Sequence, residues 1–133
     1  MKQSRISTSM LVVLAVMSIL AGCSYVSTET RHYLGVGSYP PTDPSRVEIL
    51  RSEPQRHHER LGEVILEPEG DPSLAEMEAR MRQGAAKLGA DAVVIVADKT
   101  RLMGSYLAGP WWGREVYAQY GRVIVGVAIK YTP

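Results

Sequence analysis

The segment SLAEMEARMRQGAAKLGADAVVIVA, residues 73–97, decides the fold because a helical pattern leads directly into a strand pattern. Apolar side chains recur at spacings of three or four residues in its first part, which predicts an amphipathic helix with one apolar stripe. This stripe comprises Leu74, Met77, Met81, Ala85 and Leu88. The second part is apolar at every position from Val93 to Val96. A short run that is apolar on both faces predicts a central strand, here over residues 92–97.

The two ends of the predicted helix carry capping signals. Ser73 with Glu76 matches a capping box, and Asp71-Pro72 offers an alternative start with proline at the first helical position. Gly89 predicts the left-handed residue that ends the helix. Gly84 lies inside the helix, where glycine costs about 1 kcal/mol relative to alanine. We therefore expect that Gly84 lets the helix lie close to a sheet.

Three further strands are predicted around this segment. Residues 47–50 and 60–66 precede the helix, and residues 122–131 lie near the end of the chain. The order β-β-α-β-β predicts a small α+β domain over residues 46–133, with the amphipathic helix packed on a mainly antiparallel sheet. One helix cannot cover both faces of such a sheet. The second face is therefore expected to be wet, curled on itself or buried against another subunit.

A long loop over residues 99–121 is predicted between the last two strands. It contains both tryptophans of the chain, and its aromatic candidates for partner contact are Tyr106, Trp111, Trp112, Tyr117 and Tyr120. Two interpretations are open. The aromatic side chains form a contact surface for a partner, a membrane or peptidoglycan, or they fold back and complete a core that contains no phenylalanine.

The N-terminus has the layout of a bacterial lipoprotein signal. A basic start precedes an apolar run over residues 10–20, which is shorter than the about 20 residues that a spanning helix needs. Leu20-Ala21-Gly22-Cys23 follows this run and resembles a lipobox. The resemblance implies that residues 1–22 are a signal peptide, cut between Gly22 and Cys23, and that Cys23 carries acyl chains in a lipid bilayer.

Cys23 is the only cysteine, so no intrachain disulfide can form. The next residue is Ser24, where an aspartate would resemble an inner-membrane retention signal, so we expect the periplasmic face of the outer membrane. Residues 24–45 are rich in serine, threonine, glycine and proline, which predicts a flexible tether. Tyr39-Pro40-Pro41, near its end, is alternatively expected to pack on the domain. The predicted divisions are a signal peptide (1–22), a lipidated N-terminus with tether (23–45) and a globular domain (46–133).

Composition limits the remaining function classes. Removal of the signal peptide leaves 13 basic and 14 acidic residues, a net charge of −1, which argues against nucleic-acid binding. The sequence contains no phosphate-binding loop or catalytic motif, so we expect no enzymatic activity and no cofactor. His57 and His58 are weak candidates for a metal site, because adjacent residues of an extended chain point in opposite directions.

The segment Gly84–Val94 resembles the helix-to-strand junction of the YbjQ/RcsF-like group of small bacterial proteins. Residues 39–44, 47–50 and 61–64 also resemble segments of lipoproteins in this group, so the resemblance covers about residues 39–131. It implies a fold and no activity. The group includes cytosolic proteins proposed to bind heavy metals, ring-forming relatives and an outer-membrane stress sensor. That sensor relies on disulfides, which this chain cannot form, so its role is not carried over.

The shared junction implies structural roles for four residues. Gly89 ends the helix, Ala90 and Ala92 pack tightly, and Asp91 forms hydrogen bonds in the turn. The expected function is a non-enzymatic binding or sensing module in a membrane-anchored envelope lipoprotein. Its expected partners are the lipid bilayer, through acylated Cys23, and an envelope protein or peptidoglycan. A homo-oligomeric structural module and a metal-binding protein are the alternatives.

Overall fold

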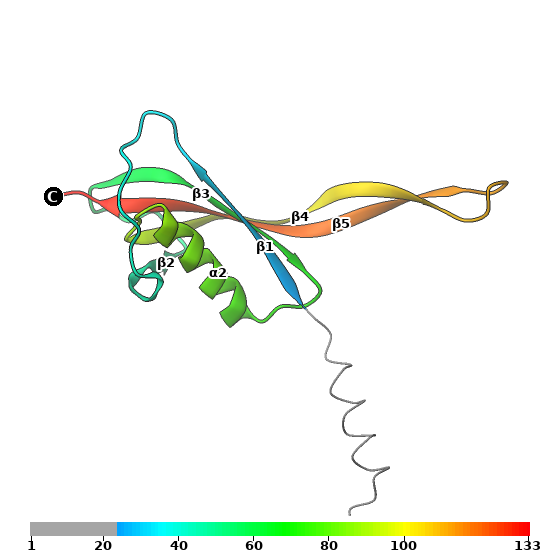
Figure 1. The fold of residues 1–133 in the computed structure, drawn as a ribbon, viewed down its shortest axis with the longest axis horizontal. Helices are drawn as coiled ribbons and strands as arrows, with labels where there is room; N and C mark the ends of the chain where they lie inside the picture. The colour runs from blue at the N-terminus through cyan, green and yellow to red at the C-terminus, as the bar shows by residue number, and fades with distance from the viewer. Residues whose placement is uncertain (1–23) are drawn as a thin grey trace, which may run out of the picture.

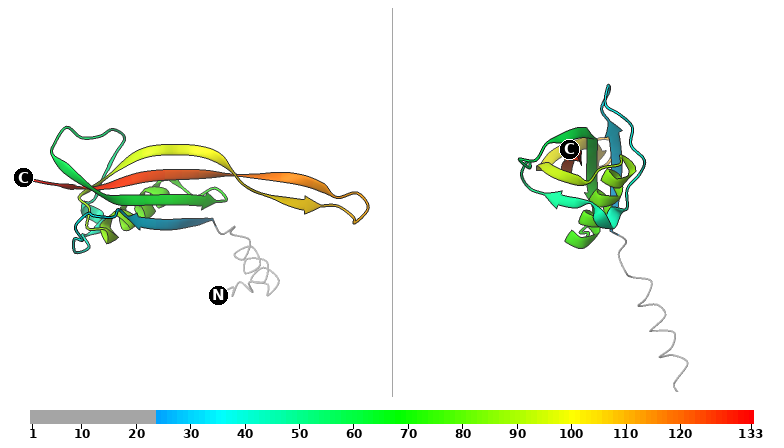
Figure 2. Two further views of the ribbon diagram at one scale, coloured as in Figure 1. Left: turned by 90° about the horizontal axis from the view of Figure 1, so that it is seen from above. Right: turned by 90° about the vertical axis from the view of Figure 1, so that its left-hand side faces the viewer.

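Five strands and one α-helix make up residues 24–133, the part of the chain that the computed structural model describes (Figure 1). The elements are β1 (Tyr25–His32), a short 3-10 helix η2 (Pro44–Arg46), β2 (Glu48–Leu50), β3 (His58–Glu69), α2 (Leu74–Lys87), β4 (Ala92–Ala108) and β5 (Glu115–Tyr131). The strands form one sheet in the order β1-β3-β5-β4-β2, in which β2 and β4 are parallel and the other pairs are antiparallel. Helix α2 covers one face of this sheet (Figure 2). The predicted α+β class with one helix on a mainly antiparallel sheet is confirmed.

The predicted tether over residues 23–45 is wrong for most of its length. Residues from Tyr25 to His32 form strand β1, which pairs along its whole length with β3 at the edge of the sheet. Val26 of this strand is buried in the core. The domain therefore begins at β1 and not at residue 46, and the element order has one strand more than predicted. The predicted signal peptide, its cleavage after Gly22 and the lipidation of Cys23 lie outside the described residues.

The segment after β1 also packs on the domain. The Tyr33 N–H donates to the carbonyl oxygen of Leu61 at 2.9 Å, and the Tyr39 hydroxyl donates to Glu59 Oε2 at 2.7 Å. The Thr42 hydroxyl donates to the carbonyl oxygen of Ala90 at 2.7 Å. These contacts confirm the alternative that Tyr39-Pro40-Pro41 packs on the domain.

Helix α2 begins and ends where the sequence predicts. The Ser73 hydroxyl accepts a hydrogen bond from the Glu76 N–H at 3.2 Å, so Ser73 is the N-cap and the alternative start at Asp71-Pro72 is wrong. At the other end Gly89 has a φ of 78°. The N–H groups of Gly89 and Ala90 donate to the carbonyl oxygens of Ala86 and Ala85, which is the hydrogen-bond pattern of a Schellman motif.

Gly84 brings α2 into close contact with the sheet, as predicted. A β-carbon at this position would lie 2.5 Å from Val64 Cγ1 of β3 and 3.2 Å from Thr30 Cγ2 of β1. Val64 is fully buried, and its branched side chain has little rotational freedom. The core therefore forms between this helix and strands β1, β3, β4 and β5, with Met81, Ala85 and Val93 at its centre.

The junction between α2 and β4 is held by Asp91. Its carboxylate accepts hydrogen bonds from Lys130 Nζ at 3.0 Å and from the Tyr131 N–H at 3.1 Å, while its own N–H donates to the carbonyl oxygen of Ile129. Ala90 and Ala92 are fully buried on either side of it. The roles that the resemblance implied for these junction residues are thus present in the structure.

The face of the sheet opposite α2 is partly covered by the chain itself. Val94 and Ile129 are buried there, with Val127 and Tyr131 packed against them. Residues 51–57 form a loop beside this face, and the Arg56 guanidinium lies 4.4 Å from the centre of the Tyr131 ring. Val96 remains 57% exposed at the edge of this cluster. This face was expected to be wet, curled on itself or buried against another subunit. In the structure it is partly covered by the chain's own loop and partly open to water.

The contact at Gly84 predicts that Gly84→Ala destabilises the domain although alanine is the better helix former. The added methyl group overlaps a buried valine, and such overpacking costs about 1–3 kcal/mol. Because the overlap is with a stiff side chain at 2.5 Å, the cost is expected to exceed the gain of about 1 kcal/mol in helix propensity. Urea unfolding followed by far-ultraviolet circular dichroism measures the change. Gln83→Ala is the matched control, because residue 83 is the exposed neighbour in the same helix and its substitution is expected to leave stability unchanged or slightly raised. A Gly84→Ala domain as stable as the wild type would contradict the close packing.

Candidate functional site

The predicted loop over residues 99–121 is wrong for most of its length, which is a two-stranded ribbon, and is confirmed only for residues 109–114. Strands β4 and β5 pair continuously out to Ala108↔Glu115, and only residues 109–114 connect them. The neighbours of this hairpin end much earlier: β2 leaves β4 at Val94, and β3 leaves β5 at Ile124. Residues 99–121, which we call the arm, therefore project beyond the sheet (Figure 1).

The tip of the arm is a tight turn that presents both tryptophans. The Gly113 N–H donates to the carbonyl oxygen of Pro110 at 3.0 Å, which places Trp111 and Trp112 at the two central positions. Gly109 precedes this turn with a φ of 107°, and a β-carbon there would lie 2.7 Å from the carbonyl oxygen of Gly113. Glycine is therefore required at residue 109 for the arm to close.

The aromatic side chains of the arm lie in water and not in the core. Trp111 and Trp112 are 78% and 74% exposed, and their rings contact each other edge to face with centroids 5.7 Å apart. Tyr106 and Tyr117 stack across the two strands at the same centroid distance. Tyr120 is also exposed, near the base of the arm. The interpretation in which these residues complete the core is wrong, because the arm extends away from it.

Sequence reasoning missed the aliphatic part of this surface. Leu102, Leu107 and Val116 are exposed on the same arm, and register places Leu107 opposite Val116. These positions follow no regular alternation of apolar and polar residues, and the surrounding glycines and proline are typical of a loop. Between residues 102 and 120 only Arg114 and Glu115 are charged. An apolar surface of this length with two adjacent opposite charges is typical of an interaction site.

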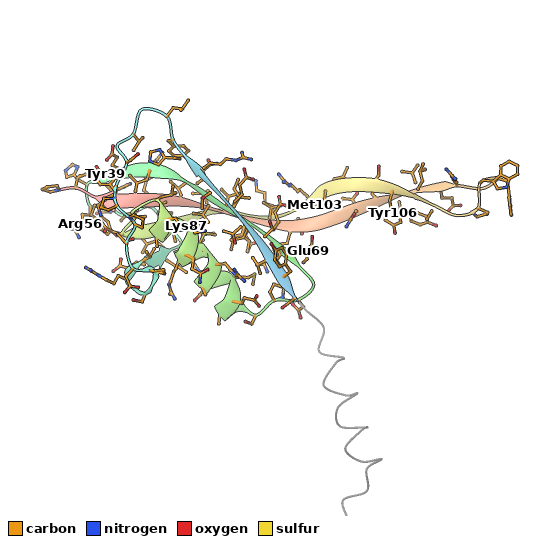
Figure 3. All side chains as sticks on the ribbon, viewed as in Figure 1. Tyr39, Arg56, Glu69, Lys87, Met103 and Tyr106 are labelled. Carbon is orange, nitrogen blue, oxygen red and sulfur yellow. The ribbon has the colours of Figure 1, made fainter. Side chains whose placement is uncertain are left out.

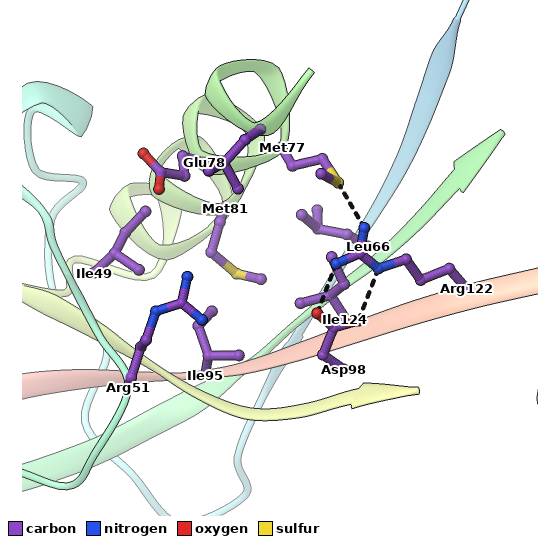
Figure 4. A pocket seen from close by; sticks show the side chains of 11 residues that line it. Ile49, Arg51, Leu66, Met77, Glu78, Met81, Ile95, Asp98, Arg122 and Ile124 are labelled. Carbon is purple, nitrogen blue, oxygen red and sulfur yellow. Dashed lines mark hydrogen bonds and ion pairs between the residues drawn. The ribbon is translucent and has the colours of Figure 1, made fainter. Parts of the chain in front are cut away.

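The base of the arm is fixed by an ion pair beside a small hollow (Figure 4). Arg122 Nε and Nη2 donate to the two carboxylate oxygens of Asp98 at 2.8 and 2.7 Å, and Arg122 Nη1 lies 3.9 Å from Met77 Sδ. This hydrogen bonding lowers the pKa of the Asp98 carboxyl and raises that of the Arg122 guanidinium. The hollow, about 150 Å³ in volume, is lined by apolar side chains such as Met81, Ile95 and Ile124 and by four charged ones, Arg51, Glu78, Asp98 and Arg122.

His57 and His58 do not form a metal site with their surroundings. His57 is exposed, whereas the two ring nitrogens of His58 lie 2.7 Å from the carbonyl oxygen of Arg56 and 3.2 Å from Glu53 Oε1. Arg60 also donates to that glutamate, and its hydrogen bond, followed by that of His58, lowers the pKa of Glu53. In residues 24–133 no three histidine, cysteine, aspartate or glutamate side chains converge as metal ligands do.

Comparison with protein-family models, with curated proteins and with solved structures finds no match to this chain. The YbjQ/RcsF-like resemblance therefore stays a prediction. Within residues 24–133, no helix has the length and apolar character needed to cross a membrane. The exposed aromatic arm is thus the feature on which a functional proposal can be built.

The ion pair at the base of the arm predicts a pH-dependent contribution to stability. Asp98→Asn is expected to lower the free energy of unfolding at neutral pH by at most about 1 kcal/mol, because both partners are partly exposed. The folded-state pKa of Asp98 lies below its unfolded value of about 3.9. The contribution is therefore complete above that unfolded value, and it is lost as the pH falls through the lower folded-state pKa.

Urea unfolding of the wild type and Asp98→Asn at neutral and acidic pH measures this effect. The double variant Asp98→Asn, Arg122→Gln serves as the control for the pair, since removing the arginine after the aspartate is expected to change stability little. A difference between wild type and Asp98→Asn that is the same at both pH values would count against the pair.

Proposed function

We propose that this chain is a lipid-anchored bacterial envelope protein whose arm binds another component of the envelope without catalysing a reaction. The observation that carries the proposal is the arm, which holds tryptophan, tyrosine, leucine and valine side chains in water. Tryptophan and tyrosine contribute a large part of the binding energy at protein interfaces. A two-stranded ribbon by itself is only marginally stable in water. A binding partner that covers the arm would stabilise it.

A binding role is also supported by the nature of the polar contacts in residues 24–133. The carboxylates that stand out each neutralise a cation in a structural contact: Asp91 holds Lys130 at the helix–strand junction, and Asp98 holds Arg122 at the base of the arm. Asp98 lines the hollow together with Glu78, but both of its carboxylate oxygens accept hydrogen bonds from Arg122. Most of the exposed large apolar side chains of residues 24–133 lie on the arm.

The anchor is proposed from the lipobox-like Leu20-Ala21-Gly22-Cys23. Because β1 begins at Tyr25, acyl chains on Cys23 would be linked to the folded domain through Ser24 alone. The domain would then lie directly on the membrane surface, at the periplasmic face of the outer membrane. This arrangement would bring the arm to partners at or near that surface: the bilayer itself, an envelope protein or peptidoglycan.

A second copy of the chain is the alternative partner. The outer edges of the arm strands carry backbone groups that no neighbouring strand pairs with in residues 24–133. Exposed strand edges of this kind can pair with the same edge of another molecule. A homo-oligomeric structural module would use this pairing.

The anchor predicts that the protein incorporates radiolabelled palmitate in bacterial cells and that Cys23→Ser abolishes the incorporation, because the thiol is the acceptor of the lipid. Labelled cells are analysed by electrophoresis and membrane fractionation. Ser24→Asp is the matched control: it is expected to keep the label but to move the protein from the outer to the inner membrane fraction. Equal labelling of wild type and Cys23→Ser would rule out this anchor.

The arm predicts that a photo-crosslinking amino acid at position 111 or 112 traps a partner in living cells. Position 34 supplies the control, because Leu34 is fully exposed in the loop after β1 and lies off the arm. Crosslinks specific to positions 111 and 112 would support the binding surface, and mass spectrometry would identify the product. Crosslinked dimers of this chain would select the homo-oligomer instead. Crosslinks only to the protein's own core would refute an exposed arm.

A further inference from the structure

The lipid-anchor end of the domain and the base of the arm lie at the same end of the sheet. Ser24 precedes β1, and its Oγ is 3.5 Å from Glu76 Oε2 at the start of α2. The first residue of β1, Tyr25, pairs with Glu69, the last residue of β3. Because β3 runs toward the arm, both residues lie at the end of the sheet from which the arm projects.

The cleft between β3 and the arm shows this proximity directly. It is lined on one side by Glu69 and Gly70 and on the other by Met103, Tyr120 and Gly121. Glu69 and Met103 are labelled on its two sides in Figure 3. A β-carbon on Gly70 would lie 3.7 Å from the Cα of Ser24. The point where Cys23 joins the domain is therefore next to the base of the arm.

This position limits how far the arm can lie from the membrane. Consecutive Cα atoms are about 3.8 Å apart, so acyl chains on Cys23 would hold the bilayer surface within a few ångströms of Ser24. The paired strands of the arm extend over residues 101–108, about 23 Å at 3.3 Å per residue. Attachment at Cys23 also makes any contact of the arm with that bilayer intramolecular, which favours it strongly.

The composition of the arm fits the interfacial layer of a bilayer. Tryptophan and tyrosine are enriched at the level of the lipid headgroups, where an apolar ring and a polar group are both accommodated. The tip carries Trp111 and Trp112, followed by Arg114 and Glu115, whose opposite charges leave no net charge to oppose insertion. The unpaired backbone edges of the ribbon need water or headgroups as hydrogen-bond partners. They limit the arm to the interface rather than the hydrocarbon centre.

We propose that the arm inserts Trp111, Trp112 and the adjacent Leu107 and Val116 into the interfacial layer of the same bilayer that holds the acyl chains of Cys23. This inference rests on the proposed lipid anchor and names the bilayer as the envelope component that the arm binds. The protein is then held to the membrane at two separate points, the acylated N-terminus and the tip of the arm. Two attachment points fix the orientation of the domain, which one lipid anchor cannot do.

The chain contains its own probe for this contact, because Trp111 and Trp112 are its only tryptophans. The full-length lipidated protein is reconstituted into vesicles of phosphatidylethanolamine and phosphatidylglycerol, with or without phosphatidylcholine brominated near the headgroup end of its acyl chains. Bromine quenches tryptophan emission only at contact distance. We expect quenching by the brominated lipid and protection from acrylamide in the aqueous phase. Because residues 102–120 carry no net charge, raising the salt concentration is expected to leave the quenching unchanged.

A matched pair of variants separates the arm from the rest of the surface. Leu107→Asp adds a charge beside the tip and is expected to lose the bromine quenching while keeping both tryptophans. Leu34→Asp adds the same charge to a fully exposed leucine off the arm and is expected to quench like the wild type. Circular dichroism confirms that both variants are folded, which is expected because neither leucine contributes to the core.

Vesicle flotation is measured on the same samples to separate the two proposals. Protein that does not float with the vesicles would refute the lipid anchor and with it this inference. Protein that floats but has tryptophans open to acrylamide and unquenched by bromine would keep the anchor and refute the insertion. The third outcome is protection from acrylamide without bromine quenching, with protection that increases with protein density in the vesicles. This outcome would refute the insertion and indicate that the arm binds a second copy of the chain.

Discussion

The continuous pairing of β4 with β5 is the constraint on which the rest of this structure depends. At one end of this hairpin its strands form the centre of the sheet, between β3 and β2; at the other end they leave the domain as the arm. One ladder, with register shifts at Ile95/Ala97 and Leu102/Gly104, therefore connects the core to the exposed tryptophans of the tip. The direction of the arm is set by the sheet. The bulge between Leu102 and Gly104 is the one irregularity of the pairing within the arm.

The parts of the fold that depend on neighbours in sequence could be predicted from the sequence. The apolar stripe, the Ser73 cap and Gly89 specify α2 through interactions within a few residues, and the apolar run after Asp91 specifies the start of β4. Even the close approach at Gly84 has a local signal, since an interior glycine is unfavourable unless packing requires it. The α+β class follows from these elements.

The remaining features depend on partners far away in the sequence. Residues 25–32 contain a single large aliphatic side chain, Val26, so their serine and threonine content favoured a tether, and only pairing with β3 makes them a strand. The strands of the arm were not predicted either, for a different reason. With both faces in water the arm has no buried face to impose a regular alternation, and its glycines and proline are typical of loops. The aromatic candidates of the site could be named from the sequence, but their exposure could not be predicted. The sequence did not predict that Leu102, Leu107 and Val116 belong to the same exposed surface.

These two departures from expectation are connected physically. A flexible segment of some twenty residues would let the domain turn freely above a membrane, whereas β1 leaves only Ser24 between Cys23 and the sheet. Free rotation would bring the apolar arm into contact with other copies, whose exposed strand edges could pair with it. With the proposed lipid on Cys23, a connection of one residue at the same end as the arm would restrict the directions in which the arm can point. The position of β1 at the sheet edge would thus determine which surface the arm can reach, and this restriction offers a physical reason for the apolar surface that the arm exposes.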